Sequence, residues 1–225
     1  MSKRIITKAN YRVHIHGTDG TLRLFIFEPD RVEIADYEYW SVSCEARFND
    51  DVVLQFNTVG VSTLQALSTT LWLLMQQLRD NLALHNFDWA AGDTDSRTIS
   101  ADDPRTLNRA VPIGETYVAA LKGDEIEQFC IQMFAPSVIH EGVRVALTTP
   151  GLAGESSIEA TNGLAALVEG FRHVHELLLD KFDGTWQFRL GDDSPVSFEA
   201  FQSIYFGAEH SPLRCTTKRP GMSTS

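Results

Sequence analysis

Cysteine is scarce in this chain, and the short motifs that mark common enzyme classes are missing. Cys44, Cys130 and Cys215 form no C-x-x-C pair, which predicts reduced thiols in a cytoplasmic protein rather than a disulfide framework. The sequence contains no G-x-S-x-G elbow, no P-loop, no G-x-G-x-x-G after a strand and no H-E-x-x-H. These absences remove the hydrolase, kinase and dehydrogenase classes that such motifs mark, without excluding other enzymes. Our leading expectation is a non-enzymatic protein with no catalytic residue, no cofactor and no bound metal.

Long apolar runs are also missing. No segment approaches the roughly 20 apolar residues that a membrane helix needs, and no apolar block follows the charged N-terminus as it would in a secretory signal. The composition, 43% hydrophobic and 22% charged, is typical of a folded globular protein. These features predict a cytoplasmic protein that has no membrane partner.

Positive charge is in short supply over the second half of the chain. Residues 101–210 hold 7 Lys and Arg against 17 Asp and Glu, within a formal net charge of -11 for the whole chain. An acidic body repels a phosphate backbone, so we expect no nucleic-acid partner. The same charge attracts a basic protein and speeds its association, although acidity can also serve solubility alone.

What the sequence does contain is an internal repeat. The segment starting at Leu64 aligns without a gap with the segment starting at Leu164, 100 residues later, and both carry apolar residues at helical spacing. A shorter match sets Cys44-x-x-x-Phe48 against Cys130-x-x-x-Phe134. Such a repeat predicts two related lobes, each closed by one long amphipathic helix.

The predicted fold class is α+β, with two pseudo-repeated lobes of antiparallel sheet and helix, plus a C-terminal strand and a short helix. The predicted parts are a first lobe (1–90), a connector (91–108), a second lobe (109–210) and a flexible tail (211–225). Expected strands of the first lobe are 11–16, 21–27, 39–48 and 52–59, with a turn at Gly17–Gly20 and a helix capped by Ser62 or Thr63. Expected elements of the second lobe are strands 110–121, 126–134 and 142–149, an insertion at 150–157, and a helix over 162–182.

Histidines offer the main candidates for chemistry. His14 and His16 lie two apart on a predicted strand and would project to one side. A metal would need further ligands that no nearby cluster supplies, so we expect an exposed hairpin face instead. On the second helix, His173 could pair with Glu169 or form an acid–base couple with Glu176.

The segment from Trp40 to Leu67 resembles a small uncharacterised bacterial domain family. In that family a W-x-C-x-x-x-(I/F) strand and a second strand lead into a helix that begins G-x-(D/S)-(S/T)-x-Q-A-L. This chain has Trp40-Ser-Val-Ser-Cys44-Glu-Ala-Arg-Phe48 and Gly60-Val-Ser62-Thr-Leu-Gln65-Ala66-Leu67, with the cysteine displaced. The resemblance covers about residues 40–80, with a degenerate second copy near 126–180, and it implies no catalytic residues. By class, small acidic proteins of this kind are similar to immunity proteins that neutralise bacterial toxins.

Three functions follow as hypotheses. The first is an immunity-type inhibitor that occludes a basic partner, such as a bacterial toxin domain, with an acidic surface. Its predicted contacts are the loop carboxylates Asp102, Asp103, Glu155, Asp192 and Asp193, and aromatic residues rimmed by acids would serve as hot spots. The alternatives are an enzyme or ligand-binding protein with an inter-lobe pocket that uses His14, His16 or His173, and a homodimeric structural module. The sequence leaves the oligomeric state open.

Overall fold

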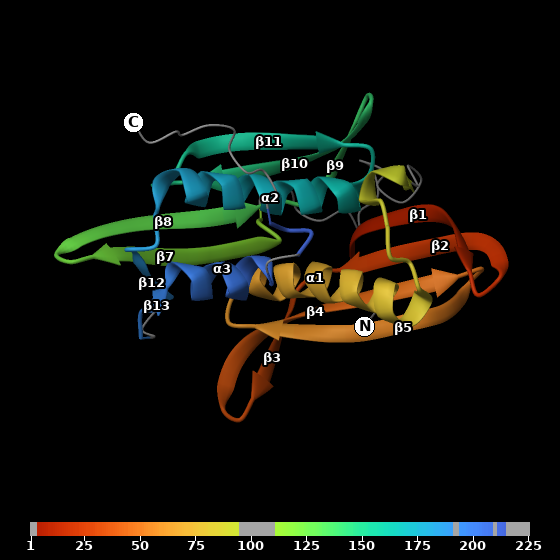
Figure 1. Ribbon diagram of the computed structural model, residues 1–225, viewed down its shortest axis with the longest axis horizontal. Helices are drawn as coiled ribbons and strands as arrows, with labels where there is room; N and C mark the ends of the chain where they lie inside the picture. Colours follow the sequence, from red (N-terminus) through yellow and green to blue (C-terminus); the bar gives the residue numbers. More distant parts are fainter. Residues whose placement is uncertain (1–3, 95–110, 191–193, 209–210, 215–225) are drawn as a thin grey trace, which may run out of the picture.

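A computed structural model of the chain describes residues 4–94, 111–190, 194–208 and 211–214. It shows the predicted α+β fold, with two antiparallel sheets and a long helix packed on each (Figure 1). The first lobe contains β1 (Ile5–Ile15), β2 (Thr18–Phe27), β3 (Asp30–Ile34), β4 (Tyr37–Phe48), β5 (Asp51–Gly60), α1 (Thr63–Leu82), the 3-10 helix η1 (Trp89–Ala91) and β6 (Asp93–Thr94). The second lobe contains β7 (Gly114–Lys122), β8 (Glu125–Met133), β9 (Ser137–Ile139), β10 (Gly142–Thr149), β11 (Gly154–Ala160), α2 (Gly163–Lys181), β12 (Gln187–Leu190), β13 (Val196–Ser197) and α3 (Phe198–Phe206).

The two lobes share one strand topology. Sheet A has the order β3-β4-β2-β1-β6, with β5 also paired to β4, and sheet B has the order β11-β10-β8-β7-β12-β13, with β9 also paired to β10. Each lobe therefore has five strands, then a long helix, then a strand that returns to pair with the first strand of the lobe. This common topology confirms that the sequence repeat is a structural duplication.

Tight two-residue turns join the strands of the first lobe. His16 and Gly17, at φ 49° and 82°, connect β1 to β2, and Asn49 and Asp50, at φ 50° and 76°, connect β4 to β5. Positive φ at both central residues is the geometry whose twist matches that of paired strands. The predicted turn at Gly17–Gly20 is therefore too late in the chain, because Thr18 already pairs with Ile15.

Side-chain caps set the first residues of both long helices. The hydroxyl of Ser62 accepts a hydrogen bond from the Gln65 N–H at 3.2 Å, and Gln65 Oε1 accepts from the Val61 N–H at 2.8 Å. One hundred residues later, Asn162 Oδ1 accepts from the N–H groups of Leu164 and Ala165 at 3.0 and 2.9 Å. Both caps satisfy first-turn donors that have no partner inside the helix.

Each long helix begins against the opposite lobe. Thr63 Oγ1 of α1 accepts from the backbone N–H of Glu115 on β7 at 2.7 Å. At the start of α2, Gly163 lies directly against Thr7 of β1, so close that a Cβ there would collide with it. The helices run in opposite directions across the middle of the molecule (Figure 1), and the buried apolar residues of both lobes form one continuous cluster. The lobes are thus fused around a shared core.

Several sequence-based expectations need correction. Strands β3 and β11 were not predicted, and β11 occupies the predicted insertion: residues 150–153 are only the turn from β10, and β11 is the counterpart of β5. The match of Cys44 with Cys130 is also wrong, because Cys44 lies on β4 whereas Cys130 lies on β8, the counterpart of β2.

The end of the second lobe packs on the core. The predicted extra strand and short helix are β12 and α3, and Tyr205 and Phe206 of α3 are buried. Leu213 is fully buried, and the backbone oxygen of Pro212 accepts from Arg172 Nε at 2.6 Å. The structure therefore differs from the predicted flexible tail over residues 211–214. Within the predicted connector, β6 pairs with β1 and so extends the first lobe.

Candidate functional site

Of the five predicted contact residues, the structure describes only Glu155. Asp102, Asp103, Asp192 and Asp193 lie outside the described residues. Glu155 is exposed near the start of β11, opposite Thr148 of β10. The surface of sheet B around Glu155 is therefore the part of the predicted partner-binding surface that the structure describes.

The face of sheet B that points away from the core, here the open face, carries Glu155. Along β7 the residues Gly114, Thr116, Val118 and Ala120 are buried, so Glu115, Tyr117 and Ala119 lie on the opposite face. Strand register adds the neighbours of this face from the other strands, namely Ile126, Gln128, Cys130, Gln132, Thr148 and Arg189. Tyr117 is 66% exposed and Ile126 is 60% exposed, so the open face presents two large side chains with apolar surface to solvent.

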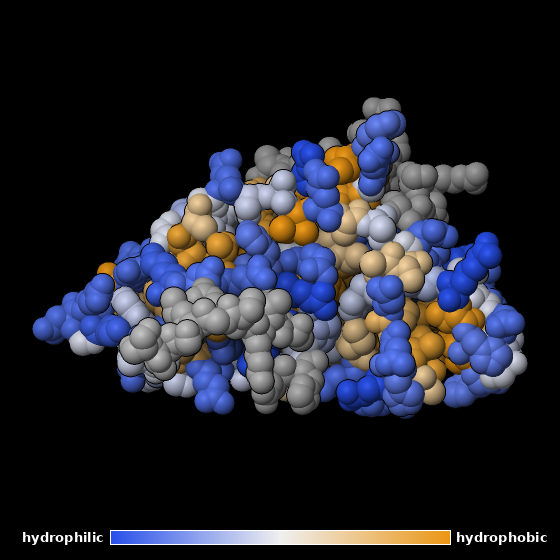
Figure 2. Space-filling view, turned by 45° about the horizontal axis from the view of Figure 1, so that its top comes forward, coloured by the Kyte–Doolittle hydropathy of each residue, from blue (hydrophilic) through white to orange (hydrophobic). Residues whose placement is uncertain are grey.

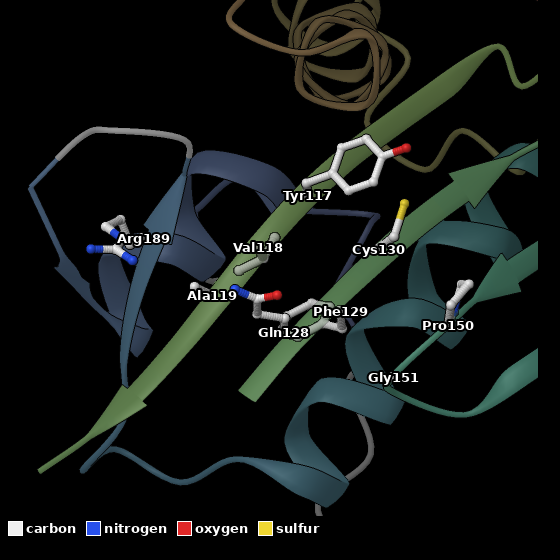
Figure 3. A pocket seen from close by; sticks show the side chains of 9 residues that line it. All are labelled: Tyr117, Val118, Ala119, Gln128, Phe129, Cys130, Pro150, Gly151 and Arg189. Carbon is white, nitrogen blue, oxygen red and sulfur yellow. The ribbon is translucent and has the colours of Figure 1, made fainter. Parts of the chain in front are cut away.

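A shallow hollow of about 460 Å³ lies on this face (Figure 3). Its lining residues are Tyr117, Val118, Ala119, Gln128, Phe129, Cys130, Pro150, Gly151 and Arg189. The turn after β10 closes one side, because the Cys130 N–H donates to the backbone oxygen of Pro150 at 3.0 Å. Gly151, at φ 81°, allows this approach, since a side chain there would collide with the backbone oxygen of Gln128.

A chain of hydrogen bonds fixes the polar side chains above the hollow. Tyr117 Oη donates to Glu115 Oε1 at 3.0 Å, and Gln132 Nε2 donates to the same oxygen at 2.5 Å. Thr148 Oγ1 in turn donates to Gln132 Oε1 at 2.6 Å. Because the Tyr117 hydroxyl is bonded to a carboxylate, its pKa is raised. The ring of Tyr117 is thereby presented in a defined orientation.

Cys130, beside Tyr117 on the neighbouring strand (Figure 3), is not an activated nucleophile. Burial raises the pKa of its thiol, and the charge of Glu115 acts in the same direction. The thiolate form that would attack an electrophile is therefore disfavoured at neutral pH. The hollow therefore offers a shaped surface and hydrogen-bonding groups, with a Cys130 thiol that is not poised for attack.

Carboxylates surround the open face. Glu115, Glu155 and Glu159 lie on it, and Asp124 and Glu125 are exposed at the end of the β7–β8 hairpin, the hydrophilic projection at the left of Figure 2. Three nearby cations are paired with carboxylates of the chain, and Arg189 lies on the open face itself. Arg144 Nη2 lies 2.6 Å from Glu159 Oε1, Lys122 Nζ lies 3.7 Å from Asp183 Oδ2, and Lys181 pairs with Glu127. The rim therefore presents net negative charge.

The histidines do not converge. His14 Nδ1 lies 2.8 Å from Asp19 Oδ1, whereas His16 is in the turn with positive φ, so the prediction that both project from one strand face is wrong. His173 Nδ1 lies 4.0 Å from Glu176 Oε2, so the predicted pair of these two residues is present. The alternative pair of His173 with Glu169 is not, because Glu169 pairs with Arg172. Among the described residues, no three His, Cys, Asp or Glu side chains are grouped as a metal would need.

A hollow between the lobes does exist, with a volume of about 570 Å³. It lies at the start of α1, and its lining residues are Arg31, Trp40, Val61, Ser62, Thr63, Val111, Pro112, Glu115, Thr116, Tyr117, Leu190 and Tyr205. No histidine belongs to this lining, so an inter-lobe ligand site would have to use other side chains than those predicted. The homodimer hypothesis stays a prediction.

Sequence reasoning missed Tyr117 and Ile126 as surface residues. Both lie in apolar strands, and the alternation of side chains shows which face is outward only once the core face is known. The buried Val118 and Phe129 supply that reference in the structure. The local pattern misleads here, because Glu125 and Glu127 share the strand face of the buried Phe129 while the apolar Ile126 lies on the exposed one.

Comparison of the chain with protein-family models, curated proteins and solved structures finds no match. The resemblance to a bacterial domain family therefore stays a prediction. In the described part of the chain, neither α1, α2 nor α3 combines the length and apolar character required to cross a bilayer.

Proposed function

We propose that this chain is a non-enzymatic binding protein of the immunity type, which neutralises a basic toxin or effector by covering it with the open face of sheet B. The observation that carries the proposal is the exposed ring of Tyr117, whose hydroxyl is hydrogen-bonded to Glu115, on a sheet face that no described helix covers and that has carboxylates around it. An aromatic anchor inside a polar rim is the usual arrangement of a protein interface.

Charge selects the class of partner. The carboxylate of Glu155 is exposed on the open face and that of the half-buried Glu115 is held there by Tyr117 and Gln132, while Arg144 is engaged by Glu159. A basic cleft, such as one that holds phosphate groups in a nuclease, would find complementary charge there. Charged rims mainly accelerate association and set salt dependence, whereas a buried aromatic anchor supplies most of the affinity.

The test is site-specific photo-crosslinking in the cells that produce the protein. A benzophenone amino acid replaces Tyr117 in one variant and Tyr37 in a matched control, since these tyrosines are 66% and 67% exposed and lie in different lobes. We expect position 117, and not position 37, to capture a basic protein that mass spectrometry identifies. No adduct at position 117, or an acidic adduct, would contradict the proposal.

The captured protein is then purified and titrated with the wild-type chain and two variants. Tyr117→Ala should weaken binding by about 30-fold, the effect of losing a ~2 kcal/mol hot spot. Glu155→Gln should slow association about two- to three-fold at low salt and have a smaller effect in high salt. Affinity that is unchanged by Tyr117→Ala, or unchanged by salt, would refute the open face as the binding surface.

A further inference from the structure

Strand β5 forms an edge of sheet A. Among the described strands, only β4 pairs with it, and the pairing runs along the whole of β5 (Figure 1). The backbone N–H and C=O groups on the other side of β5 therefore have no strand partner within the described part of the chain. Such a row of backbone groups is a template on which a further strand can form hydrogen bonds.

The composition of β5 does nothing to prevent such pairing. Natural edge strands are usually short, or they carry charged residues or proline that discourage a further strand. β5 has ten residues, and after Asp51 its sequence VVLQFNTVG contains no charged residue and no proline. Val52 and Val59 are 51% and 41% exposed. This edge is therefore long, neutral and partly apolar.

Other strands at the edges of the two sheets are protected in the usual ways. β3 has five residues, of which Asp30, Arg31 and Glu33 are charged. β6, β9 and β13 have only two or three residues each. β1 carries Lys8 and Arg12 on either side of its short pairing with β6. Against these strands, the neutrality of β5 is an exception.

Strand β11, the counterpart of β5 in the second lobe, provides an internal comparison. It is also an edge strand, paired only with β10 among the described strands, but it exposes Glu155 and Glu159 along its seven residues. In a two-fold antiparallel pair about its central residue, Ser157, Glu155 of one copy would lie opposite Glu159 of the other. Like charges in that position are destabilising. Because the lobes share one topology, the fold does not require β5 to be neutral.

We propose that β5 pairs with β5 of a second copy of this chain, antiparallel and with the two-fold axis at Phe56. In this register Phe56 lies opposite Phe56 of the other copy, and Leu54 lies opposite Thr58. Phe56 and Leu54 are only partly buried, although they face the core beside buried residues of β4. Pairing would cover them and extend the apolar core across the axis. On the outward face Gln55 lies opposite Asn57, and two amide groups supply both donors and acceptors.

The chemistry of β5 favours a second copy over a foreign chain. The strand has no charge beyond Asp51 with which to select a partner of opposite sign, and a two-fold pair brings neutral side chains only against one another. The strand is also held in place before pairing. Thr58 Oγ1 donates to the backbone oxygen of Ala66 on α1 at 2.9 Å, and a side chain at Gly60 would collide with the backbone of Ala66. A preformed edge loses little conformational freedom on association.

This inference is independent of the proposed function, because β5 and the open face belong to different sheets. Salt distinguishes the two. Each copy carries a net charge of -11, so screening of the repulsion between copies should tighten the dimer, whereas binding of a basic partner should weaken. We expect a dissociation constant on the order of 10 µM, because one strand pair covers less surface than a standard interface of ~1,600 Å².

The experiment is sedimentation equilibrium of the full chain at about 1–200 µM, on both sides of the expected dissociation constant. Asn57→Glu sets a carboxylate about 7–8 Å from its own counterpart across the axis and should weaken the dimer about five- to ten-fold. Gln55→Lys should have a similar effect. An equal mixture of the two variants should form a heterodimer of about wild-type affinity, because the new carboxylate then lies opposite the new ammonium group.

Ser157→Glu is the matched control, because Ser157 is exposed on the equivalent edge strand of the second lobe. Thermal melts verify that each variant is folded. A dimer that is kept with Ser157→Glu, weakened with Asn57→Glu and recovered in the mixture supports the proposal. A wild-type chain that is monomeric at about 200 µM, well above the expected dissociation constant, overturns it, and so does a dimer that Asn57→Glu leaves unchanged. Equal weakening by Ser157→Glu, or a mixture that stays monomeric, contradicts the pairing about Phe56.

Discussion

The cap of α2 connects three segments of the chain, and its removal should cost far more than the loss of an ordinary cap. Asn162 is fully buried. Besides accepting from two first-turn N–H groups, its Nδ2 donates to the backbone oxygens of Trp89 and Gly92 at 2.8 and 3.0 Å. One amide group thus caps the helix and fixes the segment that contains η1.

The magnitude follows from the groups that lose partners. Loss of the cap alone costs about 1 kcal/mol, and a buried carbonyl left without a donor costs a further ~1–3 kcal/mol. The oxygen of Trp89 keeps a bond from Tyr11 Oη at 3.2 Å, so Gly92 is the main orphan. We expect Asn162→Ala to lower the free energy of unfolding by about 3 kcal/mol, measured by urea denaturation.

Two variants separate capping from bridging. Ser62→Ala removes the equivalent cap of α1, whose hydroxyl has one helix N–H partner and a 3.4 Å contact with Tyr205 Oη, and should cost about 1 kcal/mol. Asn162→Asp keeps the acceptors at the helix start but sets a carboxylate against two carbonyl oxygens, so we expect a loss of about 2 kcal/mol. Wild-type stability of Asn162→Asp would refute the bridging role.

Two further predictions concern the core. Burial lowers the pKa of His175 to about 4. Because the unfolded chain takes up this proton near pH 6.5, the free energy of unfolding should fall as pH drops from 6.5 toward 4. The loss should be about 2.5 kcal/mol at pH 4.5, and urea denaturation of His175→Leu at pH 7 and 4.5 should show that much less pH dependence than the wild type. Gly163→Ala should lower the free energy of unfolding by about 2 kcal/mol, because its Cβ would collide with Thr7, whereas Gly184→Ala, with open space around it, should be neutral. Equal melting temperatures for the two glycine variants would contradict the proposed close approach of α2 to β1.

The helices and the duplication were predictable because their signals are long. Residues 64–80 and 164–180 each carry several turns of apolar periodicity, and Ser62 was one of the two predicted caps. Long periodic segments keep their identity whatever surrounds them. The strands β2, β4, β8 and β10 were also expected, since their core-facing residues alternate with polar ones.

The missed strands lack such signals. Strand β11, with the sequence GESSIEA, contains one β-branched residue, and its structure depends on seven paired positions along β10. Strand β3 has no buried residue and forms through its pairing with β4. For both strands, tertiary pairing outweighs intrinsic propensity.

The candidate site was predictable in class but not in place. The composition predicted an acidic binding surface with aromatic hot spots, and Glu155 does lie on the proposed surface. The role of Tyr117 could not be read, because it depends on which face of sheet B the helices cover. The covered face of sheet B is set by contacts such as that of Gly114 with Leu64, which join residues 50 positions apart in the sequence.

The crossed starts of the two long helices make the halves mutually dependent. Thr63 contacts Glu115, and Gly163 contacts the strand that contains Thr7, so either half expressed alone would expose the part of its helix that packs on the other lobe. A chain divided between Thr94 and Val111 should therefore yield two fragments that aggregate separately and recover the native protein when mixed. The molecule is in this sense a covalently linked dimer, suited to reporter designs in which reassembly of the two pieces is the signal.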